Sequence, residues 1–335
     1  MFTQTGRYVM QTWQVGNFKI TKVHELPIEV GLLDGLIPEL TPEAVREIDW
    51  LYPDYVNESG QILADLHSFV IDNGEHVILT DAGCGNGKSY PMQPIWSDLD
   101  TPFLERLQEA GYGRDDIDII LCTHAHLDHV GWFSMRDEEG KWVPTFPNAR
   151  LVMVRDEYER HLSQIVETGE VQDVSDAAGD DDVDLIARAF HPDTSALSNQ
   201  TRLIQEESFQ PIVDAGRLEL VPTDGQVVPG VRYESTPGHT TAHHSIRLDS
   251  DGATAFVTGD AFHHPIQIAR PDWSSQGDWD GGASARSRRA VLESCAGTDL
   301  LFMGTHFAGI TAGYIVEDGE GFRLVESRPP SVERR

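Results

Sequence analysis

Three histidines and one aspartate are crowded into the seven residues that follow an apolar stretch at Ile117–Cys122. In an extended backbone His124 and His126 point to the same side, whereas Asp128 and His129 come from the following turn and can face a second centre. Imidazole nitrogens and carboxylate oxygens are the ligands that zinc and similar divalent cations prefer. The chain must therefore fold so that the end of a buried strand presents metal ligands, and one short motif can serve two ions.

Three further turns, with the sequences PGHT, GDA and GTH, each place one potential ligand directly after an apolar run. The glycine in each turn permits a tight bend and lets the backbone approach a crowded centre. With the four donors of the first motif, we expect seven potential ligands from four loops to converge. The three additional donors are His239, Asp260 and His306.

Short apolar runs bounded by turn residues alternate with helical patterns along the chain, which is typical of an α/β protein with sheets flanked by helices. We predict a single hydrolase domain over residues 1–326 and a loose tail over 327–335, where proline and charge occur without periodicity. The expected strands are 18–23, 68–71, 77–80, 117–122, 150–154, 217–221, 231–236, 243–248, 254–258, 300–303 and 313–316, and the expected helices are 102–110, 156–167, 183–190 and 284–294.

The charge balance excludes whole classes of partner. The chain has 335 residues, with 25 Lys and Arg against 55 Asp and Glu, for a formal net charge of -30. Such a surface repels phosphate backbones and anionic membranes, so we expect a small-molecule substrate and neither nucleic acid nor membrane as partner. Three cysteines cannot form a disulfide framework, and no apolar stretch is long enough to span a bilayer, which favours a cytoplasmic protein. The oligomeric state stays open, a homodimer included.

In their order, the motifs HxHxDH, PGHT, GDA and GTH resemble those of the metallo-β-lactamase superfamily, over the region from Asp81 to His306. The resemblance implies an αββα sandwich, in which two mixed β-sheets pack face to face with helices outside. It also implies two divalent metal ions, with zinc the first expectation and iron, manganese or cobalt as alternatives. The implied ligands are His124, His126 and His239 at the first metal and Asp128, His129 and His306 at the second, with Asp260 bridging the two.

A site of this kind predicts a metal-dependent hydrolase, of the lactonase or esterase type, in which a hydroxide bridging the metals attacks the carbonyl of a small, fairly apolar substrate. Asp128 is a candidate to shuttle a proton as well as to bind metal, because a carboxylate beside the nucleophile can accept and return one. The alternatives are an organophosphate triester hydrolase, a β-lactamase, a glyoxalase-II-like thioesterase, and a non-catalytic metal-binding scaffold.

Within the superfamily, the chain looks most similar to the branch of N-acyl homoserine lactonases and methyl parathion hydrolase. Those lactonases commonly carry a tyrosine shortly after the bridging aspartate, whereas this chain has His263 and His264 after Phe262. His263 can replace the tyrosine by donating a hydrogen bond to a developing oxyanion, or it can pack beside the ligands. Asp81, in a glycine-rich loop, is expected to orient a metal ligand rather than to bind the metal.

Two segments are candidates to shape the substrate pocket. The N-terminal segment, residues 1–60, carries apolar and aromatic residues in irregular order, and packing and pocket lining are both open for it. We predict an irregular surface excursion over residues 171–210, with a lid over the site as the alternative. The residues predicted to line the pocket are Leu32, Leu33, Trp50, Tyr52 and Phe262.

Overall fold

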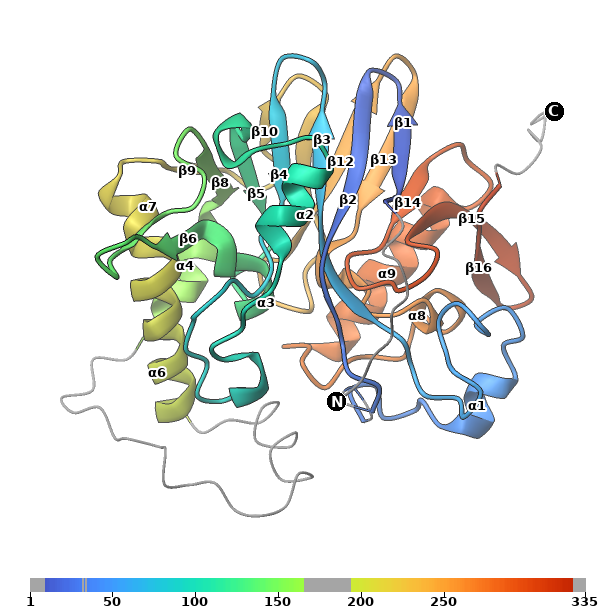
Figure 1. Cartoon of the computed structure of the whole chain (residues 1–335). Helices are drawn as coiled ribbons and strands as arrows, with labels where there is room; N and C mark the ends of the chain where they lie inside the picture. Colours follow the sequence, from blue (N-terminus) through green and yellow to red (C-terminus); the bar gives the residue numbers. More distant parts are fainter. Residues whose placement is uncertain (1–9, 32, 34, 166–193, 328–335) are drawn as a thin grey trace.

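Two seven-stranded sheets face each other in the computed structural model, which describes residues 10–31, 33, 35–165 and 194–327 (Figure 1). The first sheet has the order β1-β2-β3-β4-β5-β8-β9 and the second the order β10-β11-β12-β13-β14-β15-β16. The strands of the first sheet are β1 (Thr12–Val15), β2 (Phe18–Pro27), β3 (Asp65–Asp72), β4 (Val77–Thr80), β5 (Ile119–Cys122), β8 (Arg150–Val154) and β9 (Leu218–Val221). Those of the second are β10 (Gln226–Val228), β11 (Val231–Ser235), β12 (His244–Ser250), β13 (Ala253–Val257), β14 (Leu301–Met303), β15 (Ala312–Asp318) and β16 (Gly321–Val325).

Both sheets are mixed. The pairs β4-β5, β5-β8, β8-β9 and β13-β14 are parallel, and the other neighbouring strands are antiparallel. Parallel neighbours need a crossover connection, which is where the chain between the strands forms helices and long loops. A separate hairpin consists of β6 (Ser134–Arg136) and β7 (Trp142–Pro144).

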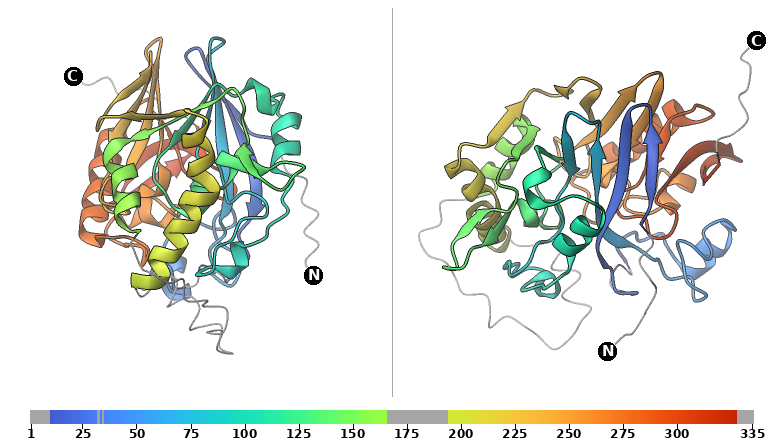
Figure 2. Two further views of the ribbon diagram at one scale, coloured as in Figure 1. Left: turned by 90° about the vertical axis from the view of Figure 1, so that its left-hand side faces the viewer. Right: turned by 45° about the horizontal axis from the view of Figure 1, so that its top comes forward.

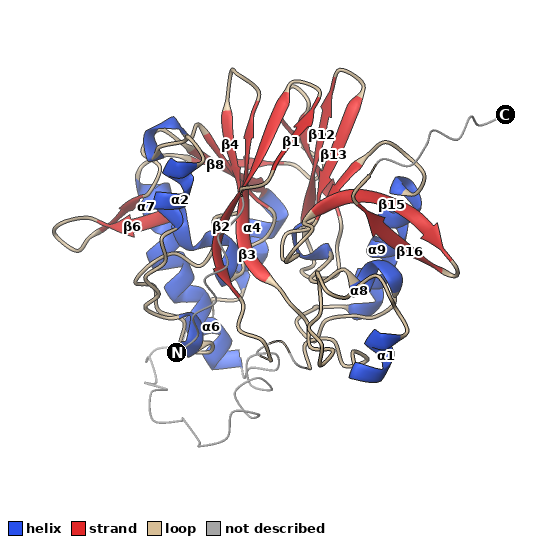
Figure 3. Ribbon diagram, turned by 45° about the vertical axis from the view of Figure 1, so that its right-hand side comes forward, coloured by secondary structure: helices blue, strands red, loops and turns tan. Residues whose placement is uncertain are grey.

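Helices cover the outer face of each sheet, as the two views of Figure 2 and the colouring of Figure 3 show. Helix α2 lies against β2 of the first sheet, whereas α9 contacts β15 and α8 contacts β16 of the second. The described helices are α1 (Pro42–Arg46), α2 (Phe103–Glu109), α3 (Leu127–Val130), α4 (Arg155–Ser163), α6 (Thr194–Ile204), α7 (Gln210–Asp214), α8 (Ile266–Ala269) and α9 (Gly281–Cys295). This αββα arrangement confirms the predicted fold.

Alternation along the strands explains why the layers stack. In β5, Ile119 and Leu121 pack between the two sheets, whereas Ile120 and Cys122 pack under the helices and loops outside the first sheet. Successive side chains of a strand point to opposite faces, so a strand buried on both faces is apolar throughout. Ile119–Cys122 is fully buried, and its end is therefore held rigidly at the sheet edge.

The segment between β2 and β3 packs mostly against the helices that cover the second sheet. Leu36, Ile37, Ile48 and Leu51 join the core formed by α8, α9 and the strands beneath them, and α1 lies in this segment. Tyr55 fixes the segment to the loop after β14, because its hydroxyl donates to the carbonyl of Ile310 at 2.8 Å. These residues of the segment therefore contribute to the core.

Part of the predicted irregular excursion is helical. Residues 194–210 form α6 and a π-helical turn, Gln205–Phe209, that leads into α7. The prediction of irregular structure over 171–210 is wrong for this part, because the residues that α6 buries include Ser198, Gln200 and Thr201, which give no apolar periodicity. The expected helix at 183–190 and the tail at 328–335 lie outside the described residues.

The described helices include none with the length and apolar character needed to cross a membrane.

Candidate metal centre

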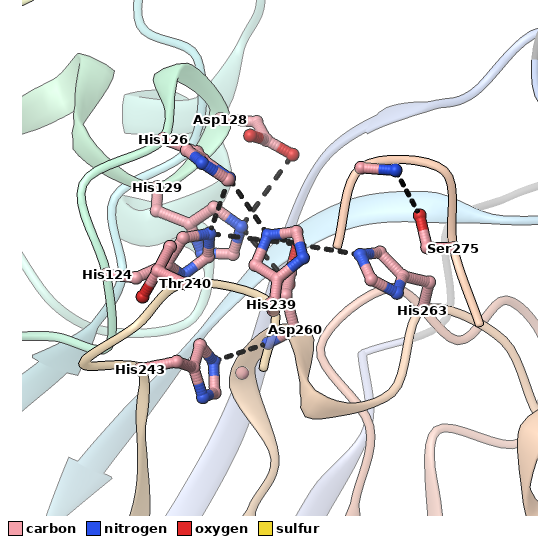
Figure 4. A network of polar contacts seen from close by, with 12 residues as sticks. His124, His126, Asp128, His129, His239, Thr240, His243, Asp260, His263 and Ser275 are labelled. Carbon is pink, nitrogen blue, oxygen red and sulfur yellow. Dashed lines mark hydrogen bonds and ion pairs between the residues drawn. The ribbon is translucent and has the colours of Figure 1, made fainter. Parts of the chain in front are cut away.

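Strand β5 places the first four donors through an abrupt change of backbone. His126 is still extended (φ -91, ψ 161), and α3 begins at the next residue. His124 and His126 therefore leave the strand on one side, while Asp128 and His129 project from the first turn of the helix (Figure 4). The predicted geometry, with His124 and His126 on one side of an extended backbone and Asp128 and His129 in the following turn, agrees with the structure.

One group of three imidazoles, the three-histidine cluster, consists of His124, His126 and His239. Nδ1 of His126 lies 3.0 Å from Nε2 of His124 and 2.9 Å from Nε2 of His239. A tetrahedral zinc ion with bonds of about 2.0–2.1 Å sets its ligand nitrogens about 3.3 Å apart, so the three nitrogens are spaced as a shared cation requires. Nδ1 of His126 has a single lone pair or a single N–H, so a hydrogen bond satisfies only one of its two neighbouring nitrogens.

The second group, the carboxylate cluster, consists of Asp128, His129, Asp260 and His306. Oδ1 of Asp260 lies 2.9 Å from Nε2 of His306 and 3.2 Å from Nε2 of His129. Its other oxygen, Oδ2, lies 3.5 Å from Nε2 of His239 and 3.9 Å from Nε2 of His124. Asp260 thus turns one oxygen to each cluster, as a bridging ligand must.

Electrostatics separate the two clusters. Burial and neighbouring histidines lower the pKa values of His124 and His126 well below the usual range, which leaves neutral rings with free lone pairs. Burial also lowers the pKa of His129, but the carboxylates of Asp260, Asp128 and Asp81 outweigh it and raise this pKa well above its usual value. The carboxylate cluster therefore calls for positive charge, which a divalent cation supplies more fully than a proton. The donor set fits two cations.

Buried polar partners orient the donors. Oδ2 of Asp81 lies 3.1 Å from Nδ1 of His129, as expected for an orienting carboxylate, and Oδ1 of Asp81 accepts the backbone N–H of Thr123 at 2.9 Å. Nε2 of His243 accepts the backbone N–H of Asp260 at 3.0 Å. Such contacts fix the ring and carboxylate directions before a metal arrives.

Asp278 is a partner that the sequence analysis missed. Its Oδ1 lies 3.1 Å from Nδ1 of His239, and its Oδ2 lies 3.5 Å from Nη1 of the buried Arg288. Burial alone would raise the pKa of Asp278, but the bond to His239 and the charges of His263, His239 and Arg288 outweigh it and lower the pKa to about 2. In the sequence, Asp278 is an aspartate far from any motif, and nothing there distinguishes it from an aspartate on the surface.

The start of the loop after β4, residues 82–84, packs so closely against residues 129–131 that a side chain does not fit between them. The backbone N–H of Ala82 donates to the carbonyl of His129 at 2.7 Å, and that of Gly131 donates to the carbonyl of Gly83 at 2.8 Å. A Cβ atom on Gly131 would lie 1.8 Å from the carbonyl oxygen of Cys84. The glycine is required for this close approach, which holds His129 in place.

Five of the seven donors line a cavity of about 990 Å³, and the other two, His124 and His129, are fully buried. His263 also lines the cavity, with its Nε2 3.5 Å from Oδ2 of Asp260, and His263 forms a third possible metal-binding group with His239 and Asp260. Burial lowers the pKa of His263 to about 4. Apolar side chains make up much of the rest of the wall: Ile28, Leu33, Leu36, Met92, Trp96, Leu197 and Ile204.

Of the five residues predicted to form the pocket wall, Leu33 lines the cavity and Leu32 lies outside the described residues. The other three do not line it. Phe262 is fully buried against Phe302, with ring centroids 5.1 Å apart, and Trp50 packs on Tyr55. Tyr52 is 53% exposed. Aromatic side chains were a poor guide because their type does not reveal whether they face core, cavity or solvent.

Comparisons with known proteins agree with this geometry. A profile of the metallo-beta-lactamase superfamily matches residues 66–298. No curated protein sequence matches the chain. Among solved structures, "AidC, a Dizinc Quorum-Quenching Lactonase", in complex with a lactone-hydrolysis product, is 21% identical, with 95% of this chain and 97% of that chain covered and a TM-score of 0.68.

Two further structures have the same fold. A hydrolase called AbOPH, described as belonging to the beta lactamase superfamily, is 22% identical over 96% of this chain and 98% of that chain, with a TM-score of 0.72. A probable metal-dependent hydrolase from Staphylococcus aureus is 22% identical over 94% and 99%, with a TM-score of 0.63. The matched profile extends over most of both sheets and includes six of the seven donors, all but His306. The chain therefore belongs to the metallo-beta-lactamase superfamily.

Proposed function

We propose that the protein is a metal-dependent hydrolase that cleaves an ester or lactone bond in a small, largely apolar substrate. The observation that carries this proposal is the presence of seven donors in two clusters joined by Asp260, five of which line a cavity with a largely apolar wall. A scaffold without activity has no need for a carboxylate that faces both clusters and for a cavity above them.

Seven residues would hold two divalent cations, of which zinc suits the histidine-rich donor set best: His124, His126, His239, Asp128, His129, His306 and Asp260. Cations bound there would acidify a shared water and polarise the carbonyl oxygen of the substrate.

Asp128 is suited to handle a proton. Its side chain is 25% exposed, whereas that of Asp260 is 5% exposed, so Asp128 is the more exposed of the two donor carboxylates that line the cavity. Oδ2 of Asp128 lies 3.6 Å from Nε2 of His306. A carboxylate held between a metal ligand and the substrate space can accept a proton from water and return it to the leaving oxygen.

His263 is suited to assist the carbonyl. Its ring is neutral at pH 7, because burial lowers its pKa to about 4, and a neutral imidazole can donate one N–H. Nδ1 has no hydrogen-bond partner among the described residues, and Nε2 lies 3.5 Å from Oδ2 of Asp260. A donor at this place can stabilise negative charge that develops on the carbonyl oxygen.

The lactone form of the proposal has the support of the structural neighbours, since AidC is a lactonase and other similar structures are N-acyl homoserine lactone hydrolases with product bound. Their low identity transfers the fold and not the substrate. The apolar wall of Leu33, Leu36, Met92 and Trp96 suits an acyl chain or another apolar group attached to the scissile carbonyl.

The test begins with metal-free protein loaded with zinc, cobalt or manganese, and with metal content measured in each sample. Turnover is then compared for acyl homoserine lactones, simple aryl esters, organophosphate triesters, a thioester and a β-lactam. We expect hydrolysis of lactones or esters at two metals per chain, with loss of both metal binding and turnover in Asp260→Asn. Faster turnover of a phosphotriester or a β-lactam would replace the proposed substrate class, and two bound metals with no turnover of any compound would indicate a scaffold.

A further inference from the structure

Arg160 is the one lysine or arginine among the described residues that line the cavity. It lies in α4, its side chain is 13% exposed, and its guanidinium pairs with Glu157, one turn earlier in the same helix. The pairing with Glu157 offsets the cost of burying this charge, and a donor of the guanidinium that the pairing does not use is available to a ligand.

The pairing uses one edge of the guanidinium only. Nε lies 3.0 Å from each carboxylate oxygen of Glu157, and Nη2 lies 2.6 Å from Oε1. Arginine carries five N–H donors in a planar fork, so Nη1 and the second hydrogen of Nη2 are left on the opposite edge. Within the described part of the chain, Nη1 has neither a hydrogen bond nor an ion pair. That free edge has the geometry that binds a carboxylate with two parallel bonds.

Glu157 holds this group rigidly beside the three-histidine cluster. Its side chain is 1% exposed, and Oε1 accepts the backbone N–H of Ala125 at 3.1 Å, between His124 and His126. Oε2 accepts the hydroxyl of Thr240 at 2.7 Å, next to His239. A single carboxylate thus connects the guanidinium to both loops that carry the cluster, and the direction of the free edge is set before a substrate binds.

The surroundings of Arg160 favour an anion as the occupant. The cavity's acidic side chains are engaged elsewhere, Asp128 and Asp260 with histidines and Asp278 with His239 and Arg288. The amide groups of Gln164 and Gln200 also line the cavity, and a side-chain amide nitrogen carries two N–H groups, of which Gln200 gives one to Gln93 and keeps one that can complete the hydrogen bonds of an anion.

We propose that the free edge of Arg160 forms a subsite for a carboxylate of the substrate, separate from the carbonyl that is hydrolysed. This inference rests on the proposed function and narrows its substrate class to esters or lactones that carry a carboxylate beyond the scissile bond. The apolar wall then takes the carbon chain, and the guanidinium takes the charged end.

The experiment measures a charge preference within matched substrate pairs. The pairs are mono-4-nitrophenyl esters of adipic, pimelic and suberic acid and the same esters with the free carboxylate replaced by a primary amide. Zinc-loaded wild-type protein is expected to show a kcat/KM ratio of acid to amide of about ten or more at the best chain length, mostly through KM. In Arg160→Gln this ratio is expected to fall to about one, and Arg160→Lys, which keeps the charge without the fork, to lie between the two.

Two further variants keep the test decisive. Arg160→Gln leaves a buried Glu157 carboxylate unpaired, so the double variant Glu157→Gln/Arg160→Gln removes both charges and is expected to lose the preference as well. Arg289→Gln is the matched control, because Arg289 pairs with Asp272 and does not line the cavity. It should keep the wild-type ratio. Metal content is measured for every variant, so that loss of zinc is not mistaken for loss of the subsite.

Failure of the subsite and failure of the proposed function give different results. A wild-type ratio of one or less at every chain length, or a ratio that survives in both Arg160→Gln and the double variant, would overturn the subsite while ester hydrolysis stands. If no ester is hydrolysed, calorimetry compares the binding of adipate and of its monoamide to the zinc-loaded protein. An advantage of adipate that disappears in Arg160→Gln would support the subsite, and equal binding in wild type would refute it.

Discussion

At the scale of single residues, two neighbouring histidines differ in their surroundings, and this difference decides which of them can contact a substrate. His263 and His264 are adjacent in sequence, and burial lowers the pKa of each to about 4. His264 is held at both ring nitrogens, by the carbonyl of Tyr55 at 2.8 Å and the backbone N–H of Ile266 at 3.1 Å. His263 lines the cavity beside Asp260. The same residue type therefore serves packing at one position and is available to a substrate at the next.

We expect His263→Ala to lower kcat by about 10- to 1000-fold on the best substrate, because a donor to the developing oxyanion is lost. Zinc content should stay at the wild-type value, as the two main clusters do not need His263. The measurement is steady-state kinetics with metal analysis on the same samples. His264→Ala serves as control. It should lower the melting temperature, and it should lower kcat less than His263→Ala does. Wild-type turnover by His263→Ala would remove the catalytic role.

The seven donors could be predicted from sequence because each stands directly after an apolar run, and strand ends share an edge. Glu157, Arg160 and Asp278 could not be predicted in this way. Glu157 and Asp278 contact a backbone N–H and a histidine ring that lie far along the chain, and Arg160 lines the cavity only because the fold places α4 beside it. Isolated charged residues in such segments are usually solvated, so residue type alone predicts nothing for them.

At the scale of elements, α4 and the two loops of the three-histidine cluster form one unit. Glu157, in the first turn of α4, accepts hydrogen bonds from Ala125 and Thr240, which belong to loops more than a hundred residues apart. Each loop end is fixed by a strand, but the relative position of the two loops depends on this carboxylate. Side chains that position ligands tune metal affinity although they never touch the metal.

We expect Glu157→Gln to weaken zinc binding at the three-histidine cluster by about 10- to 100-fold, because the amide cannot accept at both ends and leaves Arg160 without its counter-charge. The measurement is a competition titration against a chelator, with the absorption spectrum of the cobalt-substituted protein as a second readout. Asp156→Asn is the matched control on the same helix, since Asp156 bonds only the exposed Thr223 among its described contacts. Equal zinc affinity in Glu157→Gln and wild type would show that the loops hold their position without this carboxylate.

Strands were predicted from sequence better than helices, for a physical reason. The central strands β4, β5 and β8 are apolar nearly throughout, which is a clear signal. Helix α6 gives no such signal, because polar side chains form part of its buried face and border the cavity. Edge strands such as β1 and β16 are short and mixed in character, and their place is decided by pairing with a neighbour.

At the scale of the whole molecule, buried histidines make the stability of the fold depend on pH, and surface carboxylates make it depend on salt. Burial lowers the pKa of His24 and His264 to about 4 and that of His161 to about 3. An unfolded histidine titrates near pH 6.5. Between pH 6.5 and 4 the unfolded chain therefore binds more protons than the folded chain, and folding loses stability as the pH falls.

We expect the free energy of unfolding of the metal-free protein to fall with decreasing pH over this range, with the steepest decline near pH 5, about midway between the folded and unfolded pKa values. A single such histidine contributes a slope of up to about 1.4 kcal/mol per pH unit. Denaturant titrations at about 1 M salt, where the Debye length is about 3 Å, limit the competing effect of surface charge. The His264→Asn variant has no group to titrate at this position and should show a shallower decline. A flat profile from pH 6.5 to 4 would contradict neutral burial of these rings.

The net charge of -30 leads to a second prediction, because the 55 acidic residues outnumber the 25 basic ones and most of the acidic residues that the structure describes are not buried. Like charges at the surface destabilise the compact state, and salt screens them. We expect the free energy of unfolding to rise by about 1–3 kcal/mol between 10 mM and 500 mM salt, measured as a shift of several degrees in melting temperature. Screening depends on ionic strength and not on the anion, so sodium chloride and sodium sulfate at equal ionic strength should give similar rises below about 0.5 M. A melting temperature that is constant in chloride and rises only in sulfate would assign the effect to surface exclusion of the salt, and the acidic surface would then have no cost for folding.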